Sequence, residues 1–262
     1  MLAIALCIGF TSCGDDEGDG KNGENAGTGN VFPEGTKKLS SIEDEYNYKT
    51  TFNYDGNKLV TVKDGTEQTI TFTYSGNTVV MKSVYRDEIE TYTLNIGSNG
   101  FITDGTVEYV EEDGSKDRGS FTCKYNGDYL IAIETTGEYG YDNYEITWTD
   151  DNITKVVNKN KEDNNPAESR TYTSTYTTDA NVAGLSFFEE AGVDVDELEY
   201  AYYAGLLGKP TKNLLKSNDD GDGYVFSYSY EFNADKYPTK ITESESYNGN
   251  SSHSSFKTLT YK

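Results

Sequence analysis

The sequence Phe52-Asn53-Tyr54-Asp55-Gly56-Asn57-Lys58-Leu59 recurs in similar form as Phe72-Thr73-Tyr74-Ser75-Gly76-Asn77-Thr78-Val79. In each copy two aromatic residues stand two apart, a short polar turn follows, and an apolar segment begins. Side chains two apart lie on the same face of a strand. Asp-Gly and Ser-Gly supply the positive φ angles of tight hairpin turns. The repeat therefore predicts β-hairpins with one aromatic face.

Looser copies of this unit follow along most of the chain and predict an antiparallel meander in which neighbouring strands pair. Thr, Ser, Lys and Glu occupy the alternate positions, so one face of the sheet should be buried and the other wet. The fold class is all-β, a long sheet of hairpin repeats that is curved or barrel-like, and its closure is left open. The expected strands are Tyr46–Tyr54, Lys58–Lys63, Gln68–Tyr74, Thr78–Tyr85, Ile89–Ile96, Thr106–Glu111, Ser120–Tyr125, Tyr129–Thr135, Tyr144–Thr149, Ile153–Asn158, Ser169–Thr177, Tyr224–Phe232, Thr239–Ser246 and His253–Tyr261.

The strand pattern breaks between residues 181 and 217, where the spacing of apolar residues predicts one amphipathic helix near 195–207. Asp194 and Glu197 resemble a capping box at its start, and Gly208 and Pro210 are expected to end it. The helix should cover the open end or the interior of the curved sheet. Apolar residues before it are expected to pack nearby: Leu185, Phe187 and Phe188.

Composition indicates an unusual core. The chain has 262 residues, of which 34% are hydrophobic and 23 are tyrosine. A tyrosine buries a large ring and leaves its hydroxyl at a wet edge, so tyrosine is expected to build much of the core. With 45 acidic against 22 basic residues the net charge is -23. Nucleic acid and anionic headgroups are therefore excluded as partners.

The N-terminal segment resembles a bacterial lipoprotein leader. An apolar run, Leu2–Phe10, precedes Thr11-Ser12-Cys13, which resembles a lipobox. The run is too short to cross a bilayer as a helix. The expected organisation is a signal peptide at 1–12, a lipid anchor on Cys13, a flexible Gly- and Asp-rich tether at 13–35, and a single β domain at 36–262.

Acidic residues directly follow the expected anchor. Asp15-Asp16-Glu17 resembles the export signal that sends such lipoproteins to the outer face of the outer membrane. A location on the cell surface is therefore expected, with the periplasmic face of the outer membrane as the alternative.

Few residues point to chemistry. Asn218–Gly223 matches the first half of a calcium loop, but Ser229 stands where a bidentate Glu is needed. A plain acidic turn is the favoured interpretation, and calcium binding stays open. His253, the only histidine, lacks a fixed nucleophile partner, and Cys123 should be a buried apolar residue. No catalytic residue, cofactor or metal ligand is assigned, and the chain is expected not to be an enzyme.

Two further possibilities depend on the strands. Tyrosines on a sheet can form a stacking platform for sugars, or a structural ladder within the sheet, which is favoured. A membrane-spanning barrel needs strands of about 9–11 residues with an apolar outer band. Most of the expected strands are shorter and their polar face carries Thr and charged residues, which argues against a pore.

Several segments together resemble a known family. They are the leader with Cys13–Glu17, the Tyr-x-Gly-Asn hairpins, the stretch Leu198–Leu214 with its Leu-Leu-Gly-Lys-Pro, and Tyr237–Ile241. The chain is similar to Bacteroidota lipoproteins catalogued as a domain of unknown function with a porin-like fold. The resemblance covers nearly the whole chain after the leader. It implies an antiparallel, barrel-like sheet and supplies no catalytic residues.

Three functions remain as hypotheses. The first is a non-enzymatic β scaffold, anchored through Cys13, that binds a glycan or a surface protein. The second is a periplasm-facing carrier of an apolar ligand. The third is a glycan-cleaving enzyme, for which a carboxylate pair is needed and none stands out in the sequence.

Overall fold

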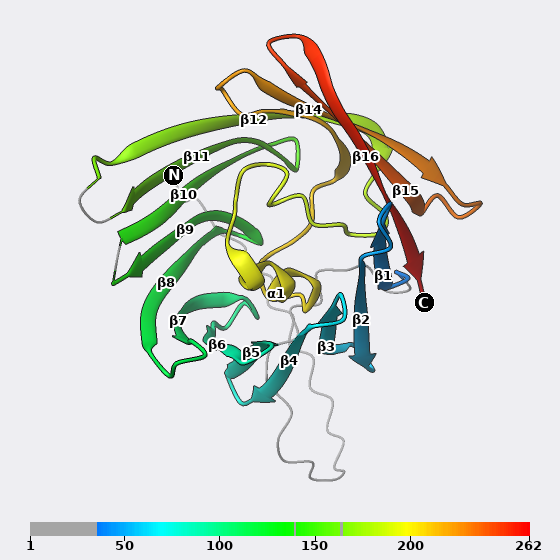
Figure 1. Cartoon of the computed structure of the whole chain (residues 1–262). Coiled ribbons are helices and arrows are strands. Elements are labelled where there is room, and N and C mark those ends of the chain that lie inside the picture. The colour runs from blue at the N-terminus through cyan, green and yellow to red at the C-terminus, as the bar shows by residue number, and fades with distance from the viewer. Residues whose placement is uncertain (1–35, 139, 163–164) are drawn as a thin grey trace, which may run out of the picture.

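A computed structural model describes residues 36–138, 140–162 and 165–262. In this part of the chain sixteen strands pair antiparallel in chain order, and the last pairs with the first, so the sheet closes into a barrel (Figure 1). The strands are β1 Leu39–Asp44, β2 Lys49–Asp55, β3 Lys58–Asp64, β4 Gln68–Ser75, β5 Thr78–Tyr85, β6 Glu88–Ile96, β7 Ile102–Val110, β8 Lys116–Asn126, β9 Tyr129–Gly137, β10 Gly140–Thr149, β11 Asn152–Glu162, β12 Glu168–Ala180, β13 Asn213–Asp219, β14 Tyr224–Phe232, β15 Pro238–Tyr247 and β16 Asn250–Tyr261.

Closure depends on a strand that the sequence pattern did not predict. In β1, Ile42 lies opposite Leu259 of β16 on one side and opposite Thr50 of β2 on the other. The pairing of β1 with β16 continues just beyond these strands. The Lys38 N–H donates to the Lys262 carbonyl at 3.0 Å, and the Lys262 N–H donates to the Lys38 carbonyl at 2.9 Å. The predicted all-β meander is confirmed, and β1 and β13 are added to it.

The alternation of the hairpin repeat decides which side chains face inward. In β4, Ile70 and Phe72 are buried, whereas the alternating Thr71 and Thr73 are exposed. Because the same alternation continues around the ring, the wall has an apolar inner face and a polar outer face.

The two ends of the barrel differ. We call the end with the β2–β3, β4–β5, β8–β9 and β10–β11 turns the closed end, and the opposite end, with the β3–β4, β5–β6, β11–β12 and β13–β14 turns, the open end. The link from β12 to β13, residues 181–212, starts and finishes at the closed end and runs through the interior. We call this segment the plug.

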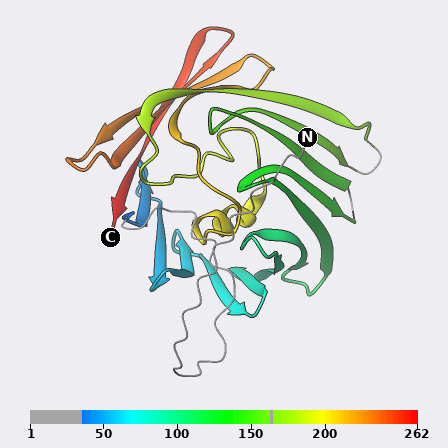
Figure 2. The same ribbon diagram turned by 180° about the vertical axis from the view of Figure 1, so that it is seen from behind.

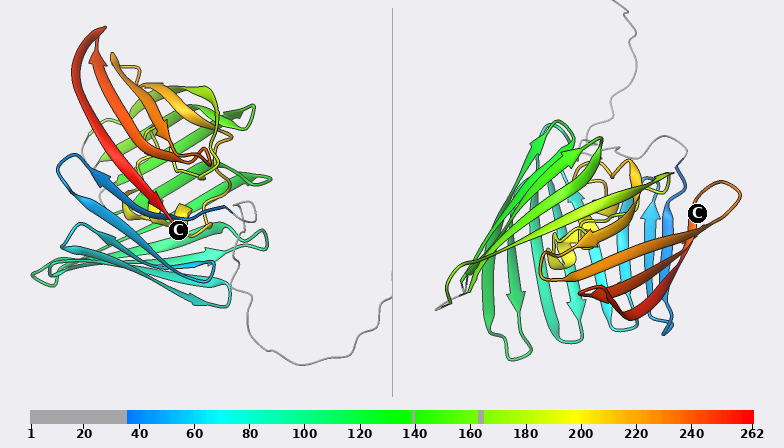
Figure 3. Two further views of the ribbon diagram at one scale, coloured as in Figure 1. Left: turned by 90° about the vertical axis from the view of Figure 1, so that its right-hand side faces the viewer. Right: turned by 90° about the horizontal axis from the view of Figure 1, so that it is seen from above.

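The plug supplies much of the core. Figures 1 and 2 show its helical part, α1, inside the ring of strands from both sides, and Figure 3 shows it enclosed by the wall in side view. Phe188 packs edge-on against Tyr202, with ring centroids 5.5 Å apart. Phe52 of β2 packs against Tyr203 at 4.9 Å. The expected packing of Leu185, Phe187 and Phe188 beside the helix is confirmed, and all three are buried.

The helix is shorter than the prediction of residues 195–207. A 3₁₀ turn covers Asp196–Glu199 and α1 covers only Tyr200–Tyr203. Val195, not Asp194, stands at the N-cap position, and no side chain caps this end. Asp196 has a φ of 48°, a left-handed conformation with which a helix cannot begin from Asp194. No helix among the described residues is long and apolar enough to cross a membrane.

Glycines in the plug explain why the helix ends early. Gly205 has a φ of 76°, its N–H donates to the Tyr202 carbonyl, and the Leu206 N–H donates to the Ala201 carbonyl. This is a Schellman ending, so the helix stops at Gly205 and not at the predicted Gly208 and Pro210. Gly208 has another role, because a Cβ there would lie 2.7 Å from the Asp128 carbonyl oxygen.

Tyrosines and one tryptophan of the wall bond to the backbone of the neighbouring strand. The hydroxyl of Tyr74 donates to the Leu59 carbonyl at 2.8 Å, and that of Tyr230 to the Leu215 carbonyl at 2.6 Å. Trp148 Nε1 likewise donates to the Leu130 carbonyl at 2.8 Å. Each large ring thus fills the interior while its polar atom bonds to the backbone.

The expectation that most strands fall short of nine residues was wrong. Ten of the sixteen strands in the described residues have nine or more residues. Several strands include a polar segment beyond the apolar residues that mark them in the sequence. One example is β12, which is 13 residues long. Hydrophobic alternation alone therefore underestimated their length.

Candidate functional site

Inward-facing positions change character along the strands. In β11 the buried Val156 is followed on the same face by Asn158 and Asn160. In β6 the buried Tyr92 is preceded on that face by Glu90 and Glu88. The apolar ends of these strands lie at the closed end and the polar ends at the open end, so the interior has an apolar half and a polar half.

The plug follows the same division. Its acidic side chains contact the polar half, and its apolar side chains join the core. Glu197 reaches β4, and Glu190 and Glu199 act electrostatically on Lys257 of β16. The acidic residues of the plug are Glu189, Glu190, Asp194, Asp196, Glu197 and Glu199.

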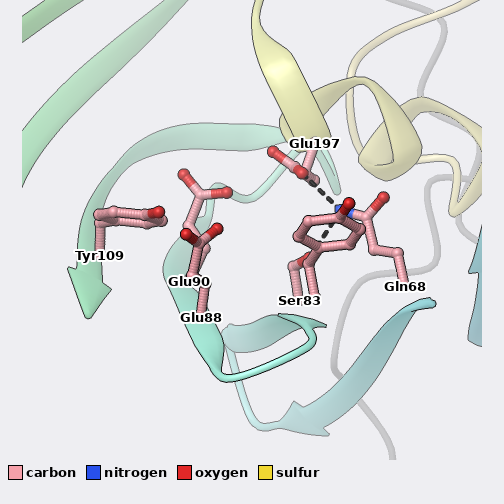
Figure 4. A pocket seen from close by; sticks show the side chains of 7 residues that line it. Gln68, Ser83, Glu88, Glu90, Tyr109 and Glu197 are labelled. Atoms are coloured by element: carbon pink, nitrogen blue, oxygen red, sulfur yellow. Dashed lines mark hydrogen bonds between the residues drawn. The ribbon is translucent and has the colours of Figure 1, made fainter. Parts of the chain in front are cut away.

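One polar cavity lies between the plug and strands β4 to β7. It has a volume of about 270 Å³, and we call it the Glu90 cavity. Figure 4 shows Glu88, Glu90 and Tyr109 on one side of it and Gln68 with Ser83 on the other, while Glu197 enters from the plug. Its lining residues are Gln68, Ser83, Tyr85, Glu88, Glu90, Tyr109 and Glu197.

A hydrogen-bonded chain crosses this cavity. Gln68 Nε2 donates to Glu197 Oε1 at 2.6 Å and to Ser83 Oγ at 3.0 Å (Figure 4). The Tyr92 hydroxyl donates to Glu90 Oε1 at 2.8 Å. The carboxyl group of Glu197 also lies close enough to Glu90 to act on it electrostatically.

Burial and like charge raise the pKa of Glu90 to about 8. Burial is the larger cause, and the nearby Glu197 carboxyl adds to it, while the Tyr92 hydroxyl opposes the shift. Glu90 therefore keeps its proton near neutral pH, as a buried carboxyl group beside a second carboxyl does.

A second group of charges lies toward β16. Burial raises the pKa of Glu190 to about 8 and that of Glu199 to about 7, and Lys257 partly offsets both shifts. The pKa of Lys257 is raised in turn, chiefly by Glu190. A lysine ammonium thus balances part of the negative charge that the plug brings inside the barrel.

The second polar cavity lies on the other side of the barrel, between β11, β12 and the β13–β14 turn. It has a volume of about 560 Å³, and we call it the Tyr172 cavity. Its lining combines two amides, a hydroxyl, two carboxylates, a guanidinium and one ring. The lining residues are Asn158, Asn160, Glu168, Ser169, Arg170, Tyr172 and Asp222.

Two contacts hold the wall of this cavity in place. Arg170 donates from Nε to Asp222 Oδ2 at 2.7 Å, and its Nη2 donates to the same oxygen. The Tyr172 ring lies against Gly192 of the plug so closely that a Cβ at Gly192 would be 2.3 Å from Tyr172 Cγ. Gly192 has a φ of 93°, which only glycine adopts readily.

The segment considered for calcium forms an acidic turn. Asp219 Oδ1 accepts the Gly221 N–H at 2.9 Å, and Asp220 Oδ1 accepts the N–H groups of Asp222 and Tyr224 at 2.8 and 3.0 Å. These oxygens serve the turn itself. Within residues 36–138, 140–162 and 165–262, no three His, Cys, Asp or Glu side chains are grouped to hold a metal ion.

The remaining candidate residues from the sequence either lie apart from one another or lie outside the residues that the structure describes. Cys123 is buried as predicted, and burial raises its pKa to about 12. His253 is an exposed residue of β16 opposite Glu245 of β15. Cys13 and the 1–12 and 13–35 segments lie outside the residues that the structure describes.

Sequence reasoning missed both cavities. A usable signal existed in the strands themselves, because Asn158 and Asn160 continue the inward face of β11 with polar residues where an apolar residue is expected. The same signal occurs at Glu88 and Glu90 of β6. The pairing of β12 with β11 and with β13 joins the asparagines to Arg170 and Asp222, and the plug brings Glu197 to Glu90; alternation within one strand specifies neither.

We predict that the stability of the fold falls as pH rises, partly through Glu90. Its pKa is about 8 in the folded protein and 4.5 ordinarily. The folded state therefore keeps a proton that the unfolded chain releases, and stabilisation is lost between these values. In Glu90→Gln, the fall in unfolding free energy from pH 5 to 9 should shrink by about 1–3 kcal/mol, as measured by urea denaturation.

Glu112→Gln is the matched control, because Glu112 is exposed in the β7–β8 turn. The unfolding free energy of this variant should depend on pH in the same way as that of the wild-type chain. Part of the fall should also survive in Glu90→Gln, since Glu190 and Glu199 act in the same direction. Equal profiles for wild type and Glu90→Gln would contradict the assignment.

Comparisons with solved structures agree with the closed barrel. A porin-like protein from Bacteroides uniformis ATCC 8492 superimposes with a TM-score of 0.64 at 16% identity, over 88% of this chain and 100% of that one. A porin-like protein from Bacteroides vulgatus ATCC 8482 gives a TM-score of 0.61 at 16% identity, over 86% and 99% of the two chains. At this identity the likeness concerns the fold.

Comparison at the sequence level identifies the family. No curated protein is significantly similar to the chain. The family described as "Domain of unknown function (DUF4595) with porin-like fold" matches residues 37–240, which include β1 to β14 and the plug. The chain therefore belongs to this family of porin-like domains.

Proposed function

We propose that this protein is a tethered binding module that takes up a polar ligand at the open end of its barrel and does not transform it. The observation that carries the proposal is the division of the interior. The apolar half is filled by the plug and the wall, whereas the polar half contains cavities of about 270 and 560 Å³. Binding sites of small ligands have volumes of this order.

The rim of the open end adds surface for such a ligand. Tyr224 of the β13–β14 hairpin and Tyr247 of the β15–β16 hairpin are exposed, with ring centroids 4.7 Å apart. Tyr85 is exposed at the end of β5, beside the Glu90 cavity. Exposed aromatic rings at the mouth of a polar cavity are typical of recognition surfaces.

The outer face supports a barrel that stands off the bilayer. Cross-strand ion pairs join Lys124 to Glu134 and Lys159 to Glu145, each at 2.5 Å. A spanning barrel carries an apolar band at this place. Charged pairs on a lipid-facing surface would be unfavourable.

The apolar-ligand carrier finds less support. The apolar cavity beside the plug, which Trp148, Ile153 and Phe188 help to line, has a volume of about 10 Å³. This is roughly the space of one water molecule. An apolar ligand would have to displace the plug, whose Leu206 and Leu207 are fully buried.

Glycan cleavage is also less well supported than binding. Glycoside hydrolases hold two carboxyl groups about 5–5.5 Å or about 6.5–9.5 Å apart. The carboxyl groups of the Glu90 cavity already have partners within the protein, because Glu197 Oε1 accepts from Gln68 Nε2 at 2.6 Å and Glu90 Oε1 accepts from the Tyr92 hydroxyl at 2.8 Å. We therefore keep the expectation that the protein is not an enzyme.

Panels of glycans and of surface proteins presented to the full chain should yield a ligand, and hydrogen exchange should then locate it. We expect slower amide exchange at 88–90 or 158–160 and no change at the closed-end turns 55–57 and 75–77. The physical reason is that a ligand in the polar half shields the open-end strands. Protection confined to the closed end, or no binding across both panels, would contradict the proposal.

The tether and its location form part of the proposal. Acylation of Cys13 followed by the 13–35 linker would hold the barrel near the outer membrane, on the cell surface or on the periplasmic face. Protease added to intact cells should digest the barrel if it is surface-exposed. Cys13→Ala should release the chain from the membrane fraction. Retention of Cys13→Ala in that fraction would argue against the anchor.

A further inference from the structure

We propose that the Tyr172 cavity is a subsite for a neutral saccharide. This inference rests on the proposed binding function and names its ligand class. The cavity opens at the polar end of the barrel between β11 and β12, and its volume of about 560 Å³ lies within the range of small-ligand sites. Its lining is polar except for one aromatic ring.

The cavity has hydrogen-bonding groups that the protein itself leaves unused. Among the described residues, the side chains of Asn160, Glu168 and Ser169 make no hydrogen bond to another residue. Asn158 makes one, from Nδ2 to Asp142 Oδ1, at the long distance of 3.4 Å. An amide offers both donors and acceptors, which suits sugar hydroxyls, since each of these also donates and accepts.

The ion pair of Arg170 and Asp222 adds preformed polar groups to the wall of the cavity. Both bonds of this pair use Asp222 Oδ2, so Asp222 Oδ1 has no hydrogen-bond partner among the described residues. A carboxylate oxygen beside a guanidinium N–H can accept from one hydroxyl and donate to its neighbour on the same ring. The ion pair forms without a ligand, so its two side chains lose little conformational freedom when a ligand binds.

The ring of Tyr172 provides an apolar surface at the same place. Gly192 packs against it, and the Arg170 guanidinium carbon lies 5.9 Å from its centroid. Gly192 of the plug and Arg170 of the same strand thus hold the ring in place. A flat apolar surface next to hydroxyl-binding groups fits the mixed character of a sugar ring, which has C–H faces and polar edges.

Charge narrows the ligand class. The chain carries a net charge of -23, and Glu168 lines this cavity. An anionic saccharide would be repelled. A peptide is less well matched, because peptide and protein sites depend on buried apolar or aromatic pockets, and this cavity offers one ring.

The test uses the full chain in detergent and an array of neutral, anionic and amino oligosaccharides, followed by calorimetric titration with the strongest neutral binder. We expect Asn160→Ala and Asp222→Asn each to weaken binding by about 3- to 30-fold, the effect of losing one or two hydrogen bonds. Asn53→Ala, a change at an exposed position on the outer face of β2, is the matched control and should leave the affinity unchanged. Circular dichroism checks the fold of each variant, and Asn160→Ala removes no internal hydrogen bond.

The outcomes separate the two proposals. Neutral saccharides that bind equally well to Asn160→Ala and Asp222→Asn would overturn this subsite and leave the proposed function standing. Binding of peptides or proteins, with no binding of any saccharide, would also overturn this subsite and leave the proposed function standing. Tighter binding of anionic than of neutral saccharides would overturn the assignment of a neutral ligand to this cavity. No binding to any probe would overturn both proposals.

Discussion

The structure depends on one geometric constraint: a closed ring of sixteen strands encloses more space than its own inward side chains can fill. Barrels of about 16–18 strands leave a water-filled channel when nothing enters them. Here the β12–β13 link turns inward and fills half of that space with Phe188, Tyr202 and Leu206. The main-chain bonds from Ile102 to Leu206 and from Lys209 to Asp128, at 2.9 and 3.0 Å, fasten it to the wall at the closed end.

The same segment brings charge into the barrel, and this explains the polar half. Acidic side chains of the plug cannot be covered by apolar residues without a large desolvation cost. They face Gln68, Glu90 and Lys257, and the carboxyl groups that are most enclosed keep a proton near neutral pH. Water and polar side chains must therefore occupy this half, which leaves the cavities available to a ligand.

Much of the wall could be predicted from the sequence. The hairpin unit around Phe52 and Phe72 gave the strand direction, the turns and the inward face, because side-chain alternation and positive-φ glycines are local properties. β1 and β13 escaped prediction for a physical reason. In β13, Leu214 and Leu215 are adjacent, and its pairing with β12 shifts register between Tyr176 and Ala180, so no regular alternation exists there.

The plug and the cavities were harder to predict. The apolar spacing from Val195 to Leu206 fits a helix, yet Gly205 ends the helix because the chain must turn back to the wall. The Tyr172 cavity joins the consecutive strands β11 and β12 to Asp222, which lies 52 residues after Arg170. The pairing of β12 with β11 and β13 brings these groups together, and the contact of Gly192 with Tyr172 adds the plug; alternation within one strand specifies neither.

The central claim, that the plug packs the apolar half without a water-filled channel, is tested most directly at Cys123. This thiol faces inward from β8 and is 7% exposed. Labelling of the native full chain with a small thiol reagent, with mass spectrometry to locate the label, measures how far water reaches it. The account predicts that Cys123 reacts only as fast as the protein unfolds, orders of magnitude more slowly than in urea. Labelling of the folded protein at the rate of the denatured chain would show an open lumen and contradict the account.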